Sequence, residues 1–129
     1  MKINRSGFTL VEIMIVVFIV ALLATLAIPN LLQARITANE SAAKATLKSI
    51  SNALENYYSI NSQYPSSTSA LLGDTPPYLN TDYFSAPHQG YNFSAALAAY
   101  TYSIVALPVS TSTGSASFSM TTQGILMQN

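Results

Sequence analysis

The chain of 129 residues contains no cysteine, no tryptophan and a single histidine. The lack of cysteine excludes disulfide bonds, thiolate metal sites and a cysteine nucleophile. With only His88, a paired-histidine metal site is excluded, and we interpret this residue, which follows Pro87 in a loop, as a surface residue. The chain also lacks a glycine-rich phosphate-binding loop. We therefore expect no enzymatic activity, no catalytic residue and no metal centre.

Charged residues are scarce, at 8% of the chain against roughly 25% in an ordinary soluble domain. Five basic and five acidic residues balance to a net charge of zero. Because nucleic-acid binding proteins present a basic surface, we expect no nucleic-acid partner. The scarcity is greatest in residues 8–28, where Glu12 is the only charged residue.

Residues 8–28 form an apolar run of roughly 20 residues, which is enough to cross a bilayer as a helix. Lys2 and Arg5 precede the run, and the positive-inside rule places this basic end in the cytoplasm. We predict a transmembrane helix at residues 8–29, with the rest of the chain outside the membrane.

Three interpretations of this segment compete. A plain membrane anchor explains its length but not Glu12, since a carboxylate at the bilayer centre costs roughly 2.5–3.5 kcal/mol. A secretory signal peptide explains the basic start and the apolar core, with a cleavage site at Thr25-Leu26-Ala27. The third interpretation gives Glu12 a role.

Residues 6–12, Ser-Gly-Phe-Thr-Leu-Val-Glu, closely resemble the cleavage and methylation signature of type IV prepilins and type II secretion pseudopilins. The resemblance continues to residues 27–30 and, more loosely, along the helix to Tyr58. It implies that a prepilin peptidase cuts after Gly7, removes the leader of residues 1–7 and methylates the new terminal amine of Phe8. It also implies that Glu12 of an incoming subunit pairs with the Phe8 amine of a neighbouring subunit. The alternative is that Glu12 pairs with the Phe8 amine of its own chain, one helical turn away.

The resemblance implies a structural subunit of a type IV pilus-like filament, a helical polymer of this chain. Its other expected partners are the prepilin peptidase, an inner-membrane assembly platform and, before assembly, membrane lipid. The precursor would be inserted in the cytoplasmic membrane with its head outside, and the product would be an extracellular or periplasmic filament. Two alternatives remain: a major pseudopilin of a type II secretion system, and a monomeric membrane-anchored binding domain.

The helix is expected to continue beyond the membrane. Pro29 lacks an N–H group and clashes with the preceding turn, so it should bend or loosen the helix. Residues 30–58 nevertheless read as strongly helical, because apolar side chains recur at steps of three, four and seven residues. These side chains are Ile36, Ala43, Leu47, Ile50, Leu54 and Tyr57. We interpret this stripe as the face covered by a sheet; a coiled-coil seam is the alternative.

Residues 30–129 are predicted to form a globular head in which the helix is followed by a loop at 59–93 and a β-meander at 94–129. Strands are expected at residues 100–107, 115–120 and 125–127, where polar and apolar residues alternate or β-formers cluster. A small antiparallel sheet over the helix stripe gives an α+β fold, as the resemblance to pilins also implies. We expect no cofactor, and calcium bound by Asp74 and Asp82 is the alternative.

Overall fold

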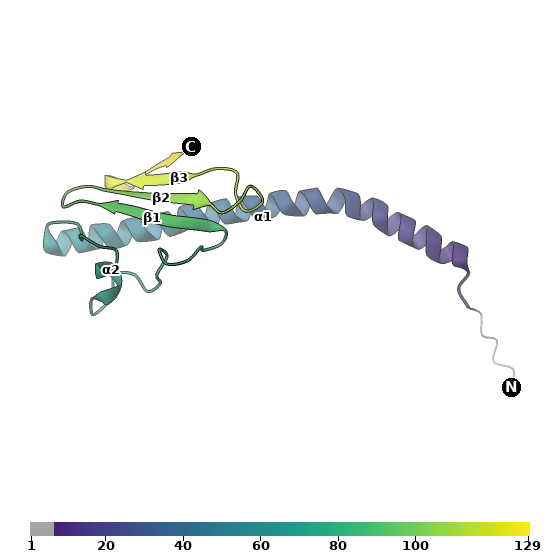
Figure 1. Cartoon of the computed structure of the whole chain (residues 1–129), viewed down its shortest axis with the longest axis horizontal. Helices are drawn as coiled ribbons and strands as arrows, with labels where there is room; N and C mark the ends of the chain where they lie inside the picture. The colour runs from purple at the N-terminus through teal and green to yellow at the C-terminus, as the bar shows by residue number, and fades with distance from the viewer. Residues whose placement is uncertain (1–6) are drawn as a thin grey trace, which may run out of the picture. The chain divides into compact units, whose positions relative to one another are not determined.

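The computed structural model describes residues 7–129 and has an α+β fold. Helix α1 spans Leu10–Asn61 and is followed by a single-turn helix, α2, at Ala70–Gly73. After an irregular connecting region comes a four-stranded sheet, with a 3-10 turn at Thr122–Gly124 between its last two strands (Figure 1). The strands are β1 (Tyr91–Leu97), β2 (Tyr102–Pro108), β3 (Phe118–Thr121) and β4 (Ile125–Gln128). Except for Gly7, the predicted leader lies outside the described residues.

The long helix buries the stripe that its sequence predicts. Of the predicted side chains, Tyr57 is half-buried, and the others are buried: Ile36, Ala43, Leu47, Ile50 and Leu54. The helix ends at Asn61, three residues beyond the expected end, and the next residue, Ser62, has a positive φ of 57°. A left-handed residue directly after a helix turns the chain away from the helix axis.

The sheet is an antiparallel meander with the order β1-β2-β3-β4. The predicted boundaries need one correction: residues 91–93 belong to β1, so the connecting region ends at Gly90 and the meander begins before residue 94. Ala95 and Ala96 have weak strand propensity, and they belong to a strand because β1 pairs with β2, with Ala95 opposite Ile104.

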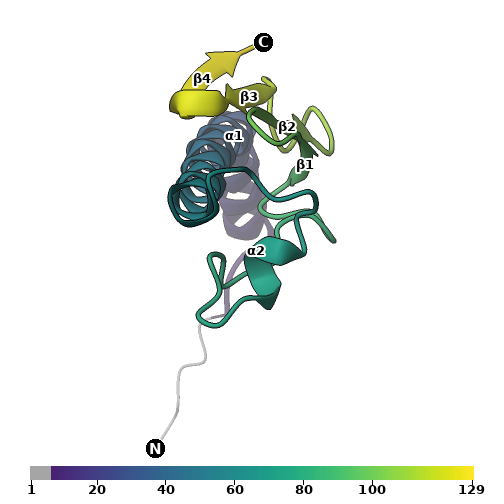
Figure 2. The ribbon, with the colours of Figure 1, turned by 90° about the vertical axis from the view of Figure 1, so that its left-hand side faces the viewer.

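The core of the head lies between the sheet and the second half of α1. Alternate residues of β2 and β3 point inward, and Ile104, Ala106 and Phe118 are completely buried. Figure 2 shows the strands along one side of the helix. Tyr91 is also fully buried, and its hydroxyl donates to the Ala116 carbonyl over 2.9 Å. A Cβ atom at Gly114 would clash with the Tyr91 hydroxyl and the ring carbon that carries it, so only glycine fits beside this side chain.

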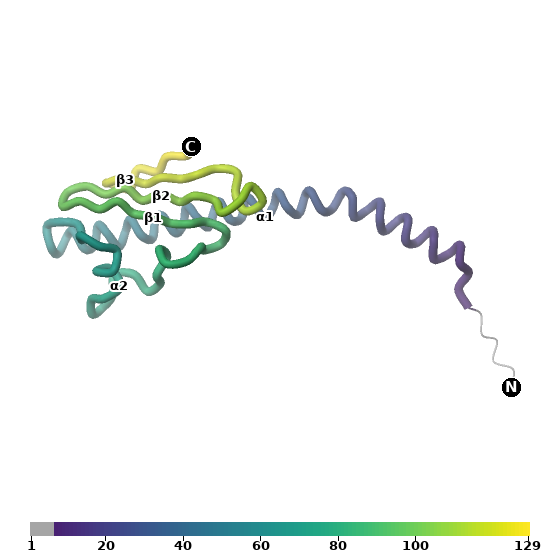
Figure 3. Tube along the Cα trace, in the orientation of Figure 1, coloured from purple at the N-terminus to yellow at the C-terminus, as the bar shows by residue number. Residues whose placement is uncertain are grey.

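The connecting region between α1 and β1, traced in Figure 3, is held to the head by Leu71 of α2. Its side chain is fully buried, and its carbonyl accepts from the N–H groups of both Tyr78 and Leu79 at 2.9 Å. The N–H of Tyr64 donates to the Ala99 carbonyl beside β1. These bonds give order to a long segment that has little regular structure of its own.

The chain divides into two compact units within α1, one ending at Ala34 and the other spanning Arg35–Asn129. Every residue of the main buried core belongs to the second unit. In the first, α1 contains a stretch of 18 residues apolar enough to cross a membrane, and none of that stretch is buried.

Candidate filament-assembly site

The first turn of α1 is closed by a reciprocal pair of hydrogen bonds between Thr9 and Glu12. The Thr9 N–H and hydroxyl both donate to Glu12 Oε2 at 2.8 Å, and the Glu12 N–H donates to Thr9 Oγ1 at 3.2 Å. This is a capping box, in which the residue before the helix and the third helical residue satisfy each other's free N–H groups. The spacing of threonine and glutamate in the sequence is its signature, and we did not use it in predicting the site. Such satisfaction matters most in lipid, where water cannot replace the missing partners.

The predicted cleavage point directly precedes this cap. Gly7, Phe8 and Thr9 lie before the helix, and the Phe8 side chain is 84% exposed. The side-chain and backbone donors of Thr9 both bond to Glu12 Oε2, so Thr9 does not occupy Oε1. In the uncut chain the Phe8 nitrogen is a peptide amide, so neither predicted pairing of Glu12 with a Phe8 amine is tested by this geometry.

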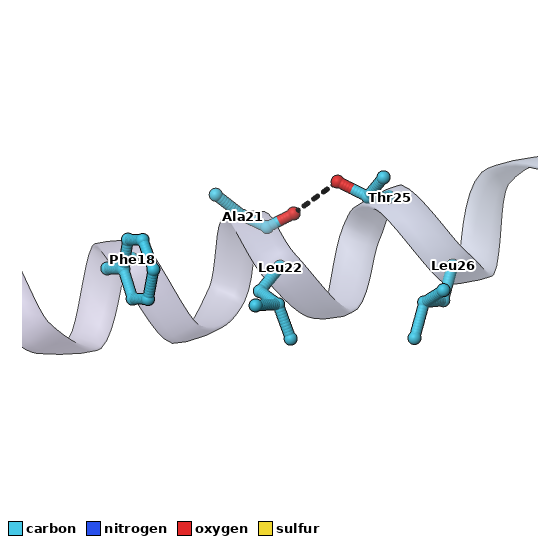
Figure 4. A pocket seen from close by; sticks show the side chains of 5 residues that line it. All are labelled: Phe18, Ala21, Leu22, Thr25 and Leu26. Atoms are coloured by element: carbon cyan, nitrogen blue, oxygen red, sulfur yellow. Dashed lines mark hydrogen bonds between the residues drawn. The ribbon is translucent and has the colours of Figure 1, made fainter.

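The apolar half of α1 presents a shallow groove, shown in Figure 4, which is lined by Phe18, Ala21, Leu22, Thr25 and Leu26. Phe18, Leu22 and Leu26 are four residues apart and form a ridge beside the small side chain of Ala21. The Thr25 hydroxyl donates to the Ala21 carbonyl at 2.9 Å, so its polar atom is satisfied within the helix. A ridge next to a row of small residues is the surface that accepts a second helix.

Pro29 lies inside α1, and the helix runs through it. Proline cannot donate to the carbonyl four residues earlier, which here belongs to Thr25. The adjacent Asn30 side chain donates to the Leu26 carbonyl at 3.0 Å, adding a bond next to this gap. The predicted bend at Pro29 stays a prediction.

In the head, two polar side chains of α1 hold the turn before β3. Glu40 Oε1 accepts from the Ser115 hydroxyl at 2.6 Å and from its N–H at 3.0 Å, and these bonds lower the pKa of Glu40. The Asn39 amide donates to the Thr113 carbonyl at 2.9 Å. One turn further along, Lys44 Nζ lies 4.7 Å from the centre of the Phe118 ring, a cation–π contact.

A second polar cluster gathers around Glu55 near the end of α1. Its carboxylate accepts from the hydroxyls of Tyr64 and Tyr102 at 3.1 Å. The buried Ser51 hydroxyl shares a hydrogen bond of 2.8 Å with Tyr102. Burial is the main cause that raises the pKa of both tyrosines. Glu55 thereby joins α1 to the connecting region and to β2, and nothing in the local sequence pattern indicated this.

The residues considered for calcium are not part of a metal cluster. Within residues 7–129, no group of three or more acidic, histidine or cysteine side chains is close enough to hold a metal ion. Asp82 accepts from the Phe84 N–H at 2.9 Å, which lowers the pKa of Asp82, and His88 Nε2 bonds to the Asp82 carbonyl oxygen. Calcium binding by Asp74 and Asp82 stays an untested prediction.

Comparison with known proteins connects this geometry to a family. The family model for the prokaryotic N-terminal methylation motif matches residues 2–28. The type IV wide pilus major component PilA4 of Thermus thermophilus is 38% identical over 92 residues, which cover 68% of this chain and 70% of the relative. The chain belongs to the family of type IV pilins and pseudopilins.

Other members of the pilin and pseudopilin family are similar over shorter shares of their length. The type II secretion system core protein G of Pseudomonas aeruginosa is 42% identical over 68 residues, 53% of this chain and 48% of the relative. The type IV major pilin protein PilA of Myxococcus xanthus is 37% identical over 93 residues, 72% of this chain and 39% of the relative. The chain thus spans about half or less of these two relatives. No solved structure matches it.

These relatives are structural proteins and not enzymes. They imply a filament-forming subunit that is a substrate of prepilin peptidase. The apolar start of α1 fits insertion into a membrane before the protein enters a pilus or pseudopilus.

Proposed function

We propose that this chain is the structural subunit of a type IV pilus-like filament and has no catalytic role. The observation that carries the proposal is the apolar half of α1, which begins at Leu10, two residues after Phe8, and leaves all its large apolar side chains exposed. Such a surface needs lipid around it first and other apolar helices later. The groove beside Phe18 and Leu22 suits the second need.

The proposed sequence of events starts in the cytoplasmic membrane. Lys2 and Arg5 stay on the cytoplasmic side, the head lies outside, and the peptidase cuts after Gly7. Cleavage turns the Phe8 amide into a positively charged amine, which the same enzyme methylates. Until assembly, Thr9 holds one oxygen of Glu12. In the filament, the free oxygen of an incoming Glu12 pairs with the Phe8 amine of a neighbouring copy, with the assembly platform bringing the two together.

A major pseudopilin of a type II secretion system is the second candidate. The similarity to core protein G of Pseudomonas aeruginosa favours it. The similarity to PilA4 covers more of the relative, however, so we place the pilus subunit first. A monomeric anchored binding domain is third, since it leaves the apolar groove of α1 without a purpose.

Processing tests the proposal directly. Intact-mass measurement of the mature protein should show an N-terminus at Phe8 carrying one additional methyl group. Because the leader removes Lys2 and Arg5, side-chain charge should fall from 5 − 5 = 0 to 3 − 5 = −2, and isoelectric focusing should show the acidic shift. A mature terminus at Ile28 would support a signal peptide instead, and an uncut Met1 would support a plain anchor.

A further inference from the structure

The last strand of the sheet is exposed along its whole length. In β4, Ile125, Leu126 and Met127 are 53%, 42% and 49% exposed. Leu126 lies opposite Met120 of β3, which is buried in the core, so both residues project from the same face of the sheet. Ile125 and Met127 project from the other face. The strand lies at the edge of the sheet, as Figure 2 shows, and carries uncovered apolar side chains on both faces.

The backbone of β4 also has an open side. Ser117 and Asn129 exchange both of their backbone hydrogen bonds, at 3.1 and 3.0 Å. Antiparallel pairs alternate between bonded and non-bonded positions, so Ile125 and Met127 bond to β3 while Leu126 and Gln128 direct their N–H and C=O groups to the free edge. This edge can accept another extended segment or a polar side chain.

Nothing in the sequence protects this edge. Soluble proteins usually guard edge strands with lysine, proline, a bulge or a covering segment. Residues 83–129 contain no Asp, Glu, Lys or Arg, so all four strands of the sheet are without formal charge. An apolar, uncharged and open edge strand associates with another surface unless something covers it.

A second copy of this chain is the occupant that fits. Identical copies meet the sheet without repulsion between like charges, because it has none. The exposed parts of three side chains amount to a few hundred Å², on the order of the ordinary apolar patch of a monomer and well below the roughly 800 Å² per partner of a stable complex. The contact is therefore too small to hold a dimer and is suited to a polymer that other contacts hold together.

We propose that the β4 patch, Ile125, Leu126 and Met127 with the free backbone edge, packs against the head of a neighbouring copy in the filament. The proposal rests on the filament function proposed above. The contact is heterologous, joining β4 of one copy to a different surface of the next, as a helical polymer requires.

Single cysteine variants test the contact cleanly, because the chain has no cysteine of its own. Leu126→Cys and Met127→Cys are made in the full chain, with Val109→Cys, at a position 51% exposed beyond β2, as the matched control. Maleimide labelling rates are measured in isolated filaments, in unassembled subunits in the membrane and in subunits dispersed in detergent. Because a packed contact excludes water and solutes, the Leu126→Cys and Met127→Cys chains should label on the order of tenfold more slowly in filaments than in either unassembled form. The labelling rate of the Val109→Cys chain should change by less than about twofold in the same comparison.

The outcomes separate the two proposals. Equal labelling rates of the Met127→Cys chain in filaments and in dispersed subunits would overturn the β4 contact. Equal slowing of the Val109→Cys chain would also overturn it, since the protection would not be specific to β4. Slow labelling already present in unassembled membrane subunits would also overturn it, by assigning the patch to lipid or another protein. A Met127→Cys chain that is cleaved and folded but forms no filaments, while Val109→Cys does, would support it. Absence of filaments from the wild-type chain would refute the proposed function instead.

Discussion

At the scale of single residues, Glu12 has one role within its own chain and a second, proposed role in the filament, and the two require different partners. Within the chain it closes the first turn of α1 through Thr9, a capping role that needs no other subunit. In the proposed filament it neutralises the Phe8 amine of a neighbour. The two roles are compatible because Thr9 bonds to Oε2 and does not occupy Oε1, and substitutions at Thr9 and Glu12 can tell them apart.

We predict that Glu12→Val protein is cleaved and held in the membrane but forms few or no filaments. Removing a carboxylate from an apolar helix leaves insertion unchanged or improved. In the filament, however, it leaves the neighbouring amine buried without a partner, and breaking one side of a buried ion pair costs about 3–5 kcal/mol. Electron microscopy of sheared filaments and immunoblotting of membranes measure the two effects.

Thr9→Val is the control, because it removes the capping hydroxyl and keeps the acid. Loss of a cap costs about 1 kcal/mol, so filament yield should fall much less than in Glu12→Val. Equal loss in the two variants would show that capping is the function of Glu12, and normal filaments from Glu12→Val would reject the intersubunit pair.

At the scale of elements, the head depends on polar bonds between α1 and distant segments. Glu40 holds the turn that leads into β3, and Glu55 holds the connecting region and β2. Within residues 7–129, no buried side-chain nitrogen or oxygen is left without a hydrogen-bond partner. These bonds fix where each segment meets the helix, since a buried polar atom left unpaired costs about 1–3 kcal/mol.

We predict that Glu40 makes the stability of the head depend on pH. Its pKa lies below the ordinary value of 4.5 in the folded protein, chiefly because of the Ser115 hydroxyl. The stabilisation is therefore fully present above that ordinary value and is lost as the pH falls through the lower folded-state pKa. Glu40→Gln should cost about 1 kcal/mol at pH 7, since the site is partly exposed and bonds to a charged group are stronger than neutral ones. The variant's stability should also change less with pH in the acid range.

Thermal melts of wild type, Glu40→Gln, Ser115→Ala and the double variant measure this coupling. The double variant should lose less than the sum of the single losses, because both substitutions remove parts of one interaction. Strict additivity at pH 7, or an unchanged acid transition in Glu40→Gln, would contradict the prediction.

At the scale of the whole molecule, the two units differ in how much of their apolar surface is buried within the chain. The first exposes an apolar helix, whereas Arg35–Asn129 contains the complete buried core. The proposed cleavage and membrane insertion concern the first unit, whereas the proposed filament contacts involve both, through Glu12 in the first and β4 in the second.

We predict that deleting residues 1–30 releases a soluble, folded head. Its core lies entirely in the unit that is kept, so circular dichroism should show mixed α and β content with a cooperative melt. The β4 patch is too small for a stable dimer, so light scattering should report a monomer at micromolar concentration. An unfolded or aggregated product would show that the head needs its filament neighbours in order to fold.

Much of this protein could be predicted from local sequence, because the features concerned depend on residues only a few positions apart. The membrane-length helix follows from composition over about 20 residues, and the buried stripe from Ile36 to Leu54 follows from the period of the helix. The family follows from the short motif around Gly7 and Glu12. The cap formed by Thr9 and Glu12 was equally local and could have been predicted from their spacing.

Tertiary structure alone decided the features that depend on distant segments meeting. Residues 91–97 become a strand because β2 pairs with them. Glu40 accepts a hydrogen bond from Ser115, which lies 75 positions later in the sequence. Three apolar residues in a row give β4 the composition of a buried strand, and its position at the edge of the sheet leaves them exposed. Pattern and propensity state which face of an element is apolar, whereas the packing of the whole head determines which of those faces is covered.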